Sequence, residues 1–185
     1  MDFIKALETR RSVRSYQERG VDRSLVEKLI TLATQAPSAM NSQPWAFVVI
    51  TDQEMLEQYS TYSKELLLAT MEQFPLLEKY RGVLSQKSFN IFYKAPALVV
   101  IYAKPEIPQP QDNCCLAAQN FMLSAHDAGL GTCWIGFARE FLNSPEAKAE
   151  LGIPAEYTAI APMILGWPAA ESPAVPRKAP EIYWK

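Results

Sequence analysis

The chain has 185 residues, of which 49% are apolar and 21% are charged, and its formal net charge is −2. These values are typical of one globular domain with a full core, and they give no electrostatic basis for binding nucleic acid or an acidic membrane surface. The single histidine, His126, excludes multi-histidine metal sites and argues against a histidine-based catalytic triad.

The number of cysteines and the character of the N-terminal segment predict the cellular compartment of the protein. The N-terminal segment lacks the basic-then-apolar order of a signal peptide, and no apolar run reaches transmembrane length. An odd number of cysteines without a signal peptide predicts a cytoplasmic protein with no disulfide framework. Cys114 and Cys115 lie in an apolar helix without basic neighbours, which predicts inert packing thiols.

Two helices are predicted before the first strand. Asp2 is a suitable N-cap for a short helix over residues 2–9. A second helix is predicted over residues 22–36, with Ser24 and Glu27 at the spacing of a capping box. Its apolar stripe consists of Leu25, Val26, Leu29, Ile30 and Ala33.

Between these helices the stretch RRSVRSY carries Arg10, Arg11, Ser12 and Arg14. Three guanidiniums and a hydroxyl at a helix end can surround one phosphate with charge-assisted hydrogen bonds. Alternatively, the cations offset the negative C-terminal end of the first helix, and taken alone this is the commoner role.

The stretch APSAMNSQPWAFVVI follows, and it changes from a polar, proline-bounded loop to an apolar run at Trp45–Ile50, which predicts a buried strand. Ser38, Asn41 and Gln43 offer uncharged donors and acceptors, which suit a flat heterocycle better than a metal. The alternative is a turn whose amides cap its own backbone, and this is the commoner role of such a loop.

Helices then alternate with strands. Thr51 and Glu54 have capping-box spacing for a helix that Pro75 should end or kink, and residues 59–93 are expected to be mostly helical. Residues 96–103 predict a second buried strand, and residues 104–111 a proline-bent loop. Alternating strands and helices predict a mixed α/β or α+β sandwich whose sheet is covered by helices.

The second half begins with a helix over residues 112–128 that is free of charge in its middle, so we expect it to be buried in the core or against a second subunit. Gly129 is well placed to end it, and His126 near its end is expected to be a helix-end cation or a hydrogen-bond donor. A short helix capped by Ser144 and a strand over residues 157–165 follow.

The segment GLGTCWIG starts like a dinucleotide-binding fingerprint, but Trp134 occupies the third glycine position and the segment leads from helix into strand. We therefore expect no Rossmann site. Beyond Gly166 the prolines exclude a helix or a central strand. Aromatic residues at the end of this tail favour docking, on a partner subunit, over disorder. Taken alone, Arg177 and Lys178 would be ordinary solvated residues.

Together these motifs resemble the nitroreductase family of flavoenzymes: RRSVRSY, APSAMNSQPW, GLGTCWIG after the apolar helix, and LGWP followed by PRKAP. The resemblance covers nearly the whole chain and is weakest over residues 59–92. It implies an α+β fold, a nitroreductase-like α-β sandwich in which helices cover a mixed sheet. It also implies one domain over residues 1–185 and an intertwined homodimer in which residues 166–185 wrap the partner subunit.

The resemblance also implies an FMN site at the subunit interface and no metal. The phosphate and ribityl contacts would be Arg10, Arg11 and Ser12, completed by Arg177 and Lys178. The basic residue at the pyrimidine edge would be Arg14. The loop on the isoalloxazine, often from the other subunit, would contribute Ser38, Met40, Asn41 and Gln43. The segment on the flavin face, with backbone N–H groups for N5 and O4, would be Trp134, Ile135 and Gly136.

The implied activity is that of an FMN-dependent oxidoreductase. It would transfer hydride from NADH or NADPH through the flavin to nitroaromatic, quinone or similar small-molecule acceptors by a ping-pong mechanism. No amino-acid nucleophile is needed, and Arg14 would favour the reduced, anionic flavin. Two alternatives stay open at this point: a flavin carrier or sensor without turnover, and a flavin-consuming or dehalogenating enzyme of the same fold.

Overall fold

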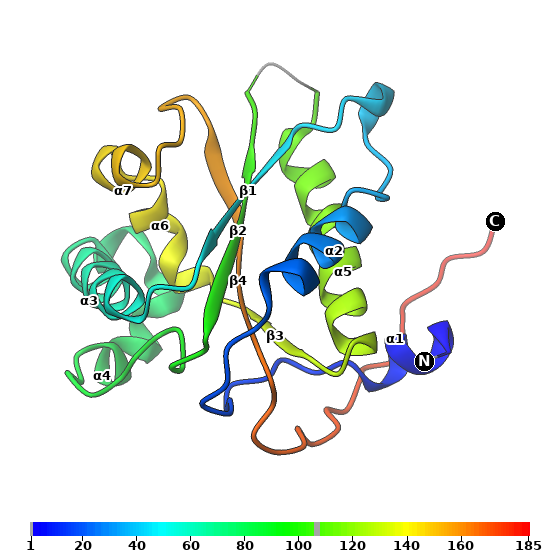
Figure 1. Ribbon diagram of the computed structural model, residues 1–185, viewed down its shortest axis with the longest axis horizontal. Coiled ribbons are helices and arrows are strands. Elements are labelled where there is room, and N and C mark those ends of the chain that lie inside the picture. Colours follow the sequence, from blue (N-terminus) through cyan, green and yellow to red (C-terminus); the bar gives the residue numbers. More distant parts are fainter. Residues whose placement is uncertain (1, 106–107) are drawn as a thin grey trace.

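The computed structural model describes residues 2–105 and 108–185, so part of the expected loop at 104–111 lies outside the described residues. A central sheet is covered by helices on both faces, which confirms the predicted α+β sandwich (Figure 1). The sheet has the order β1-β2-β4-β3. Its strands are β1 (Trp45–Ile50), β2 (Ala97–Ala103), β3 (Gly131–Trp134) and β4 (Thr158–Gly166).

The three pairings between these strands are all antiparallel, whereas the sequence predicted a mixed sheet. Parallel pairing is found, among the described residues, as an isolated bridge between Ser12 and Thr132. Strands covered on both faces are continuously apolar, which is the pattern typical of parallel sheets. Strand direction was therefore not visible in the sequence.

The helices form two layers (Figure 1). One face of the sheet is covered by α2 (Arg23–Ala33) and α5 (Pro110–Asp127), and α1 (Phe3–Thr9) packs beside α5. The other face is covered by α3 (Gln53–Ala69), α4 (Arg81–Leu84), α6 (Arg139–Leu142) and α7 (Pro145–Glu150). Short 3-10 turns are η1 (Ala39–Asn41), η2 (Met71–Gln73), η3 (Pro75–Tyr80) and η4 (Gly136–Ala138).

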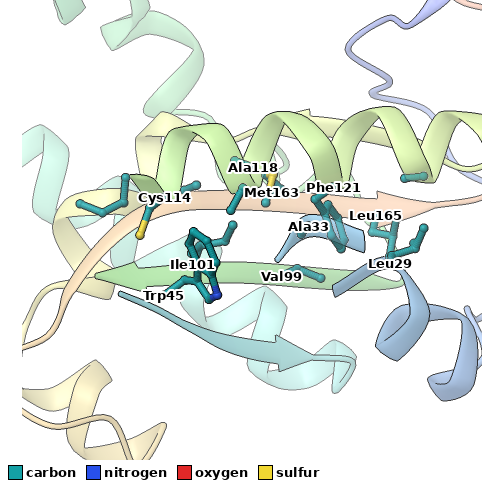
Figure 2. Close-up of a cluster of buried hydrophobic side chains, with 14 of the residues drawn as sticks. Leu29, Ala33, Trp45, Val99, Ile101, Cys114, Ala118, Phe121, Met163 and Leu165 are labelled. Carbon is teal, nitrogen blue, oxygen red and sulfur yellow. The ribbon is translucent and has the colours of Figure 1, made fainter. Parts of the chain in front are cut away.

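Strand β2 connects the two hydrophobic cores, because it is buried along its whole length. Val99 and Ile101 point toward α2 and α5, where Phe121 is one of the largest buried side chains (Figure 2). Val100 and Tyr102 point to the opposite core, beneath α3 and α6. Full burial of each large apolar side chain contributes about 1.5–3 kcal/mol, so this alternation stabilises both layers at once.

Strand β1 has the predicted bounds but is only partly buried. It lies at an edge of the sheet, and Val49 is 40% exposed. The predicted burial of this strand is therefore wrong in its middle. A run of apolar residues indicates a strand, but it does not show whether that strand lies inside the sheet or at an exposed edge.

Two predicted capping boxes are also wrong. The N-cap position of α2 is Asp22 instead of Ser24, although the Asp22 side chain makes no capping hydrogen bond. The N-cap of α3 is Asp52 instead of Thr51, and its carboxylate accepts from the backbone N–H of Glu54 at 2.9 Å. Aspartate caps a helix as well as serine or threonine does, so a neighbouring aspartate competes for the position. The predicted ends at Gly129 and Ser144 are confirmed.

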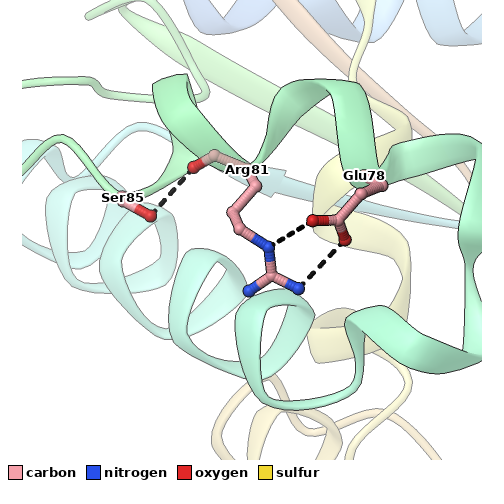
Figure 3. Close-up of polar contacts among 3 residues, drawn as sticks. All are labelled: Glu78, Arg81 and Ser85. Carbon is pink, nitrogen blue, oxygen red and sulfur yellow. Dashed lines mark hydrogen bonds and ion pairs between the residues drawn. The ribbon is translucent and has the colours of Figure 1, made fainter.

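Residues 59–93, predicted to be mostly helical, fold into the end of α3, two 3-10 turns, α4 and a final turn. On the surface of this region Arg81 donates from Nε and Nη2 to the Glu78 carboxylate, at 2.6 and 3.0 Å, and Ser85 donates to the Arg81 carbonyl (Figure 3). Exposed pairs of this kind contribute at most about 1 kcal/mol. Over residues 2–105 and 108–185, no helix is long and apolar enough to cross a membrane.

Candidate functional site

The arginine segment lies against the edge of β3. The N–H of Val13 donates to the Thr132 carbonyl at 2.9 Å, next to the bridge between Ser12 and Thr132. This approach requires glycine at position 131, because a Cβ there would lie 2.6–2.8 Å from the Val13 side chain. The glycine of the rejected dinucleotide fingerprint therefore serves packing, and it brings residues 10–14 beside residues 131–136.

A cleft of about 530 Å³ separates this segment from the C-terminal tail. Arg10, Arg11, Ser12 and Arg14 line one side, and the charged residues on the tail side are Arg177 and one carboxylate, Glu171. Burial, the charge of Arg177 and the charge of Arg11, in that order, lower the pKa of the half-buried Arg10. Converging like charges favour a bound anion, because it removes their mutual repulsion. Lys178 is exposed and does not line this cleft.

Arg11 differs from its neighbours because part of its guanidinium donates hydrogen bonds to backbone carbonyls at the C-terminal end of α1. Its Nη1 donates to the carbonyls of Glu8 and Arg10, at 2.7 and 2.9 Å. Its Nε is buried and has no hydrogen-bond partner among the described residues. The helix-end alternative is therefore realised by Arg11, whereas Arg10 and Arg177 approach each other across the cleft.

Arg14 lies over an aromatic ring from a distant part of the chain. Its Cζ is 5.9 Å from the ring centroid of Tyr93, which packs edge-on against Phe89. Tyr93 and Lys94 both have φ of 53°, in the left-handed region that non-glycine residues seldom occupy. Such strain gathers at ligand sites and switches. Sequence reasoning missed Tyr93, because no local pattern relates it to residue 14.

The end of β3 and the two residues after it form the segment that was expected at the flavin face. Trp134 is half-buried, Ile135 is buried and Gly136 is exposed at the start of η4. The N–H of Ile135 donates to the Pro162 carbonyl at 2.8 Å, so this donor already has a partner. The implied backbone donor for a flavin is therefore better met by Gly136.

The amide loop lies at the other end of the sheet from the arginines, as the positions of η1 and residues 10–14 show (Figure 1). Its polar groups bond to one another: Ser38 Oγ accepts from the N–H of Gln43 at 3.0 Å, and Gln43 Nε2 donates to Asn41 Oδ1 at 3.2 Å. Within one chain the loop therefore adopts the alternative considered from the sequence, a turn whose polar side chains bond within the turn itself. Met40, Asn41 and Gln43 nevertheless have positive φ, and Met40 is 90% exposed. One chain alone does not bring this loop to the cleft.

The thiols are poor nucleophiles. Burial raises the pKa of Cys114 to about 12. Burial also raises the pKa of Cys133, although Arg14, Ser12 and Arg10 oppose the shift. Burial raises the pKa of Cys115 as well, so both thiols agree with the inert packing role predicted for them.

His126 behaves differently from a helix-end cation. Burial and the charges of Arg10 and Arg11 lower its pKa below the usual value. Burial first, and then the charges of Arg10 and Arg11, thus act against the cation that was one of the two predicted roles. Its ring Nε2 lies 2.8 Å from Thr9 Oγ1, so the predicted role in hydrogen bonding is confirmed.

Fold and cleft together define an α+β sandwich with an arginine-lined cleft suited to a phosphate group. A sequence model described as "Nitroreductase family" matches residues 7–167. The chain therefore belongs to the nitroreductase family, as its motifs indicated.

Two relatives share the name "Putative NADH dehydrogenase/NAD(P)H nitroreductase". That of Archaeoglobus fulgidus is 30% identical over 175 residues, covering 92% of this chain and 87% of the relative. That of Methanothermobacter thermautotrophicus is 30% identical over 140 residues, covering 74% of this chain and 61% of the relative, so less than two thirds of its length is spanned.

A nitroreductase with bound FMN from Desulfitobacterium hafniense superposes with a TM-score of 0.82 at 24% identity, and the match covers 100% of both chains. More distant relatives have other names. A 5,6-dimethylbenzimidazole synthase of Rhodospirillum rubrum is 26% identical over 93% of this chain and 85% of its own length. An iodotyrosine deiodinase of Haliscomenobacter hydrossis is 25% identical over 84% of this chain and 80% of its own length.

Proposed function

We propose that this protein is an FMN-dependent oxidoreductase that passes electrons from NADH or NADPH to nitroaromatic, quinone or similar small-molecule acceptors. The observation that carries the proposal is the cleft in which Arg10 and Arg177 converge in a member of the nitroreductase family. When bound, FMN would supply the two-electron chemistry, which no side chain of this site offers.

The residues present fit such a cofactor. Arg10 and Arg177 would bind the phosphate from two sides, and Ser12, which lines the same cleft, offers a hydroxyl beside them. Arg14, which lies over Tyr93, would be next to the ring system of the flavin. Its positive charge there would stabilise negative charge on the reduced ring. The thiols take no part, because burial keeps them protonated.

We further propose that the working unit is a homodimer. Within one chain the amide loop at Ser38–Gln43 lies far from the cleft, so a second copy has to supply that loop if it is to contact the flavin (Figure 1). The chain also exposes apolar side chains that a partner would cover. They are Phe3, Ile4, Leu7, Leu116, Tyr183 and Trp184.

The decisive experiment is anaerobic mixing of the flavin-loaded protein with NADH or NADPH. Bleaching of the flavin absorbance, followed by recovery on addition of a quinone or nitroaromatic, is the expected result. A protein that binds FMN but is not bleached by either nucleotide would be a carrier or sensor. Initial-rate lines that stay parallel when both substrates are varied would support the ping-pong scheme, and intersecting lines would contradict it.

A second candidate function comes from the relatives named deiodinase and dimethylbenzimidazole synthase. The dimethylbenzimidazole synthase and the deiodinase described above are 26% and 25% identical to this chain, whereas the two relatives from Archaeoglobus fulgidus and Methanothermobacter thermautotrophicus are 30% identical. The same flavin-loaded protein therefore needs two further assays. Iodide release from iodotyrosine after reduction would favour the dehalogenating function. Consumption of reduced FMN in the presence of oxygen would favour the flavin-consuming function.

A further inference from the structure

The chain's only histidine lies beside the arginine cluster, at the end of α5. His126 Nε2 is 2.8 Å from Thr9 Oγ1. The Thr9 hydroxyl donates to the Lys5 carbonyl at 2.6 Å, so toward His126 it accepts from Nε2–H. Both the neutral ring in this tautomer and the imidazolium carry that proton. The ring therefore titrates at Nδ1, and the contact with α1 is kept in both states.

His126 shares a cavity of about 720 Å³ with Arg10 and Arg11, and Glu171 of the tail also lines it. Arg10 and Arg11 line the neighbouring cleft as well. Among the described residues, the charged groups around the imidazole are two arginines that oppose its protonation and two carboxylates, those of Glu171 and of Asp127 on its own helix.

We propose that His126 is a further member of the phosphate site: when a phosphate binds at Arg10, Nδ1 of His126 takes up a proton, and the imidazolium adds positive charge next to the arginine that holds the anion. This inference rests on the proposed function, because it uses Arg10, one of the two arginines assigned there to the FMN phosphate. Burial is the largest cause that lowers the pKa of His126, and the charges of Arg10 and Arg11 follow it. A bound anion offsets these two charges and so raises the pKa of the ring. Proton and phosphate then bind cooperatively.

The linkage has a definite sign. A ring whose pKa rises when phosphate binds takes up a proton in the complex, so phosphate affinity increases as pH falls through that pKa. A rise of one pKa unit corresponds to a tenfold increase in affinity. The phosphate monoester itself gains a proton near pH 6, which opposes the effect. The contribution of His126 therefore has to be measured as a difference from a variant.

The matched variant is His126→Gln, whose side-chain amide can still donate to Thr9 but cannot titrate. The affinities for FMN and for riboflavin are measured by flavin fluorescence between pH 5.5 and 8, for the wild-type protein and for His126→Gln. In each protein the ratio of the FMN affinity to the riboflavin affinity gives the contribution of the phosphate group to binding. We expect the ratio for the wild-type protein, divided by the ratio for His126→Gln, to increase several-fold as the pH falls from 8 to 5.5. Identical pH curves for the two proteins would overturn the proposal.

A direct measurement comes from proton NMR, because a single histidine gives one unambiguous Hε1 resonance. The pKa of His126 is expected to be higher with inorganic phosphate or FMN bound than with riboflavin bound. An unchanged pKa would exclude the proposed linkage. If FMN does not bind at any pH, the flavin function fails, and the titration with inorganic phosphate alone still decides the role of His126.

Discussion

At the scale of single residues, three arginines close in sequence have three different environments. Arg11 satisfies carbonyls at the end of α1, Arg10 faces Arg177 across the cleft, and Arg14 lies over Tyr93. Substitutions at these positions should therefore have separable effects on helix stability, phosphate binding and flavin chemistry.

The first prediction concerns Arg14→Gln. If Arg14 lies at the flavin ring, its charge stabilises the reduced, anionic flavin more than the oxidised one. A charge near the surface contributes on the order of 1–4 kcal/mol, and about 1.4 kcal/mol corresponds to roughly 30 mV for a two-electron couple. The variant should therefore bind FMN with a midpoint potential lower by some tens of millivolts. Titration against a reference dye measures the potential.

Arg81→Gln is the control for this measurement. Arg81 pairs with Glu78 on the outer surface of the helical layer (Figure 3). Its loss should leave the potential unchanged. Equal potentials for Arg14→Gln and the parent protein would remove Arg14 from the flavin ring.

At the scale of elements, the close contact between β3 and the arginine segment depends on Gly131. Alanine there would place its Cβ 2.6–2.8 Å from Val13, on backbone that carries the sheet bridge. We predict that Gly131→Ala destabilises the fold by about 1–3 kcal/mol, as overpacking does, and weakens FMN binding by displacing residues 10–14. Urea unfolding and flavin fluorescence measure the two effects.

Gly82→Ala tests whether any added methyl has this effect. Position 82 lies in α4, and a Cβ there would meet nothing within 4 Å among the described residues. Alanine should therefore be neutral or stabilise the helix by up to about 1 kcal/mol. FMN affinity equal to the parent's in Gly131→Ala would show that residues 10–14 do not depend on this contact.

A buried lysine joins α3 to the segment that carries Tyr93. Lys64 is 7% exposed, and its Nζ donates to the carbonyls of Phe89 at 2.6 Å and Gln86 at 3.1 Å. Lys64→Met would leave these carbonyls without a charged donor. We predict a loss of about 1.5–3 kcal/mol in the free energy of unfolding, measured by urea denaturation.

The matched control is Lys79→Met, because the Lys79 ammonium lies at the surface over the ring of Tyr80. That contact contributes about 0.5–1 kcal/mol at an exposed site. If both variants unfolded at the same urea concentration, Lys64 would not hold the turn. A lowered flavin potential in Lys64→Met would in addition link this turn to Arg14 through Tyr93.

At the scale of the whole molecule, the tail is anchored at its start and extends away from the sheet beyond it. The N–H of Gln17 donates to the Trp167 carbonyl at 2.9 Å, and the Arg19 guanidinium lies 4.1 Å above the Trp167 ring. The C-terminus then leads away from the sheet (Figure 1), and Trp184 is 89% exposed. An apolar end held away from its own core fits a tail that binds a second copy.

The corresponding prediction is a dimer of twice 20.8 kDa that depends on the tail end. The double variant Tyr183→Ser, Trp184→Ser removes exposed aromatic surface and keeps Arg177 in place. We expect it to dissociate at concentrations where the parent stays dimeric, as measured by light scattering. Removal of residues 172–185 should abolish FMN binding as well. A truncated protein that remains a flavin-bound dimer would exclude a structural role for the tail.

The sequence by itself determined the elements and the family. The bounds of β1, the cap at Ser144 and the end of α5 at Gly129 were all predictable, because each depends on residues a few positions apart. The motif set was sufficient for the nitroreductase family for the same reason, since each motif is a short local pattern.

The tertiary structure alone decided how these elements meet. The antiparallel order of the sheet, the contact of Arg14 with Tyr93 and the distance between the amide loop and the arginine cleft all join residues far apart in the chain. Local sequence preferences do not predict contacts between such distant residues, because the free energy of these contacts comes from burial and charge interactions that exist only after folding. The same reason explains His126: its low pKa comes from burial and from arginines 115 or more positions away, which no pattern around residue 126 reveals.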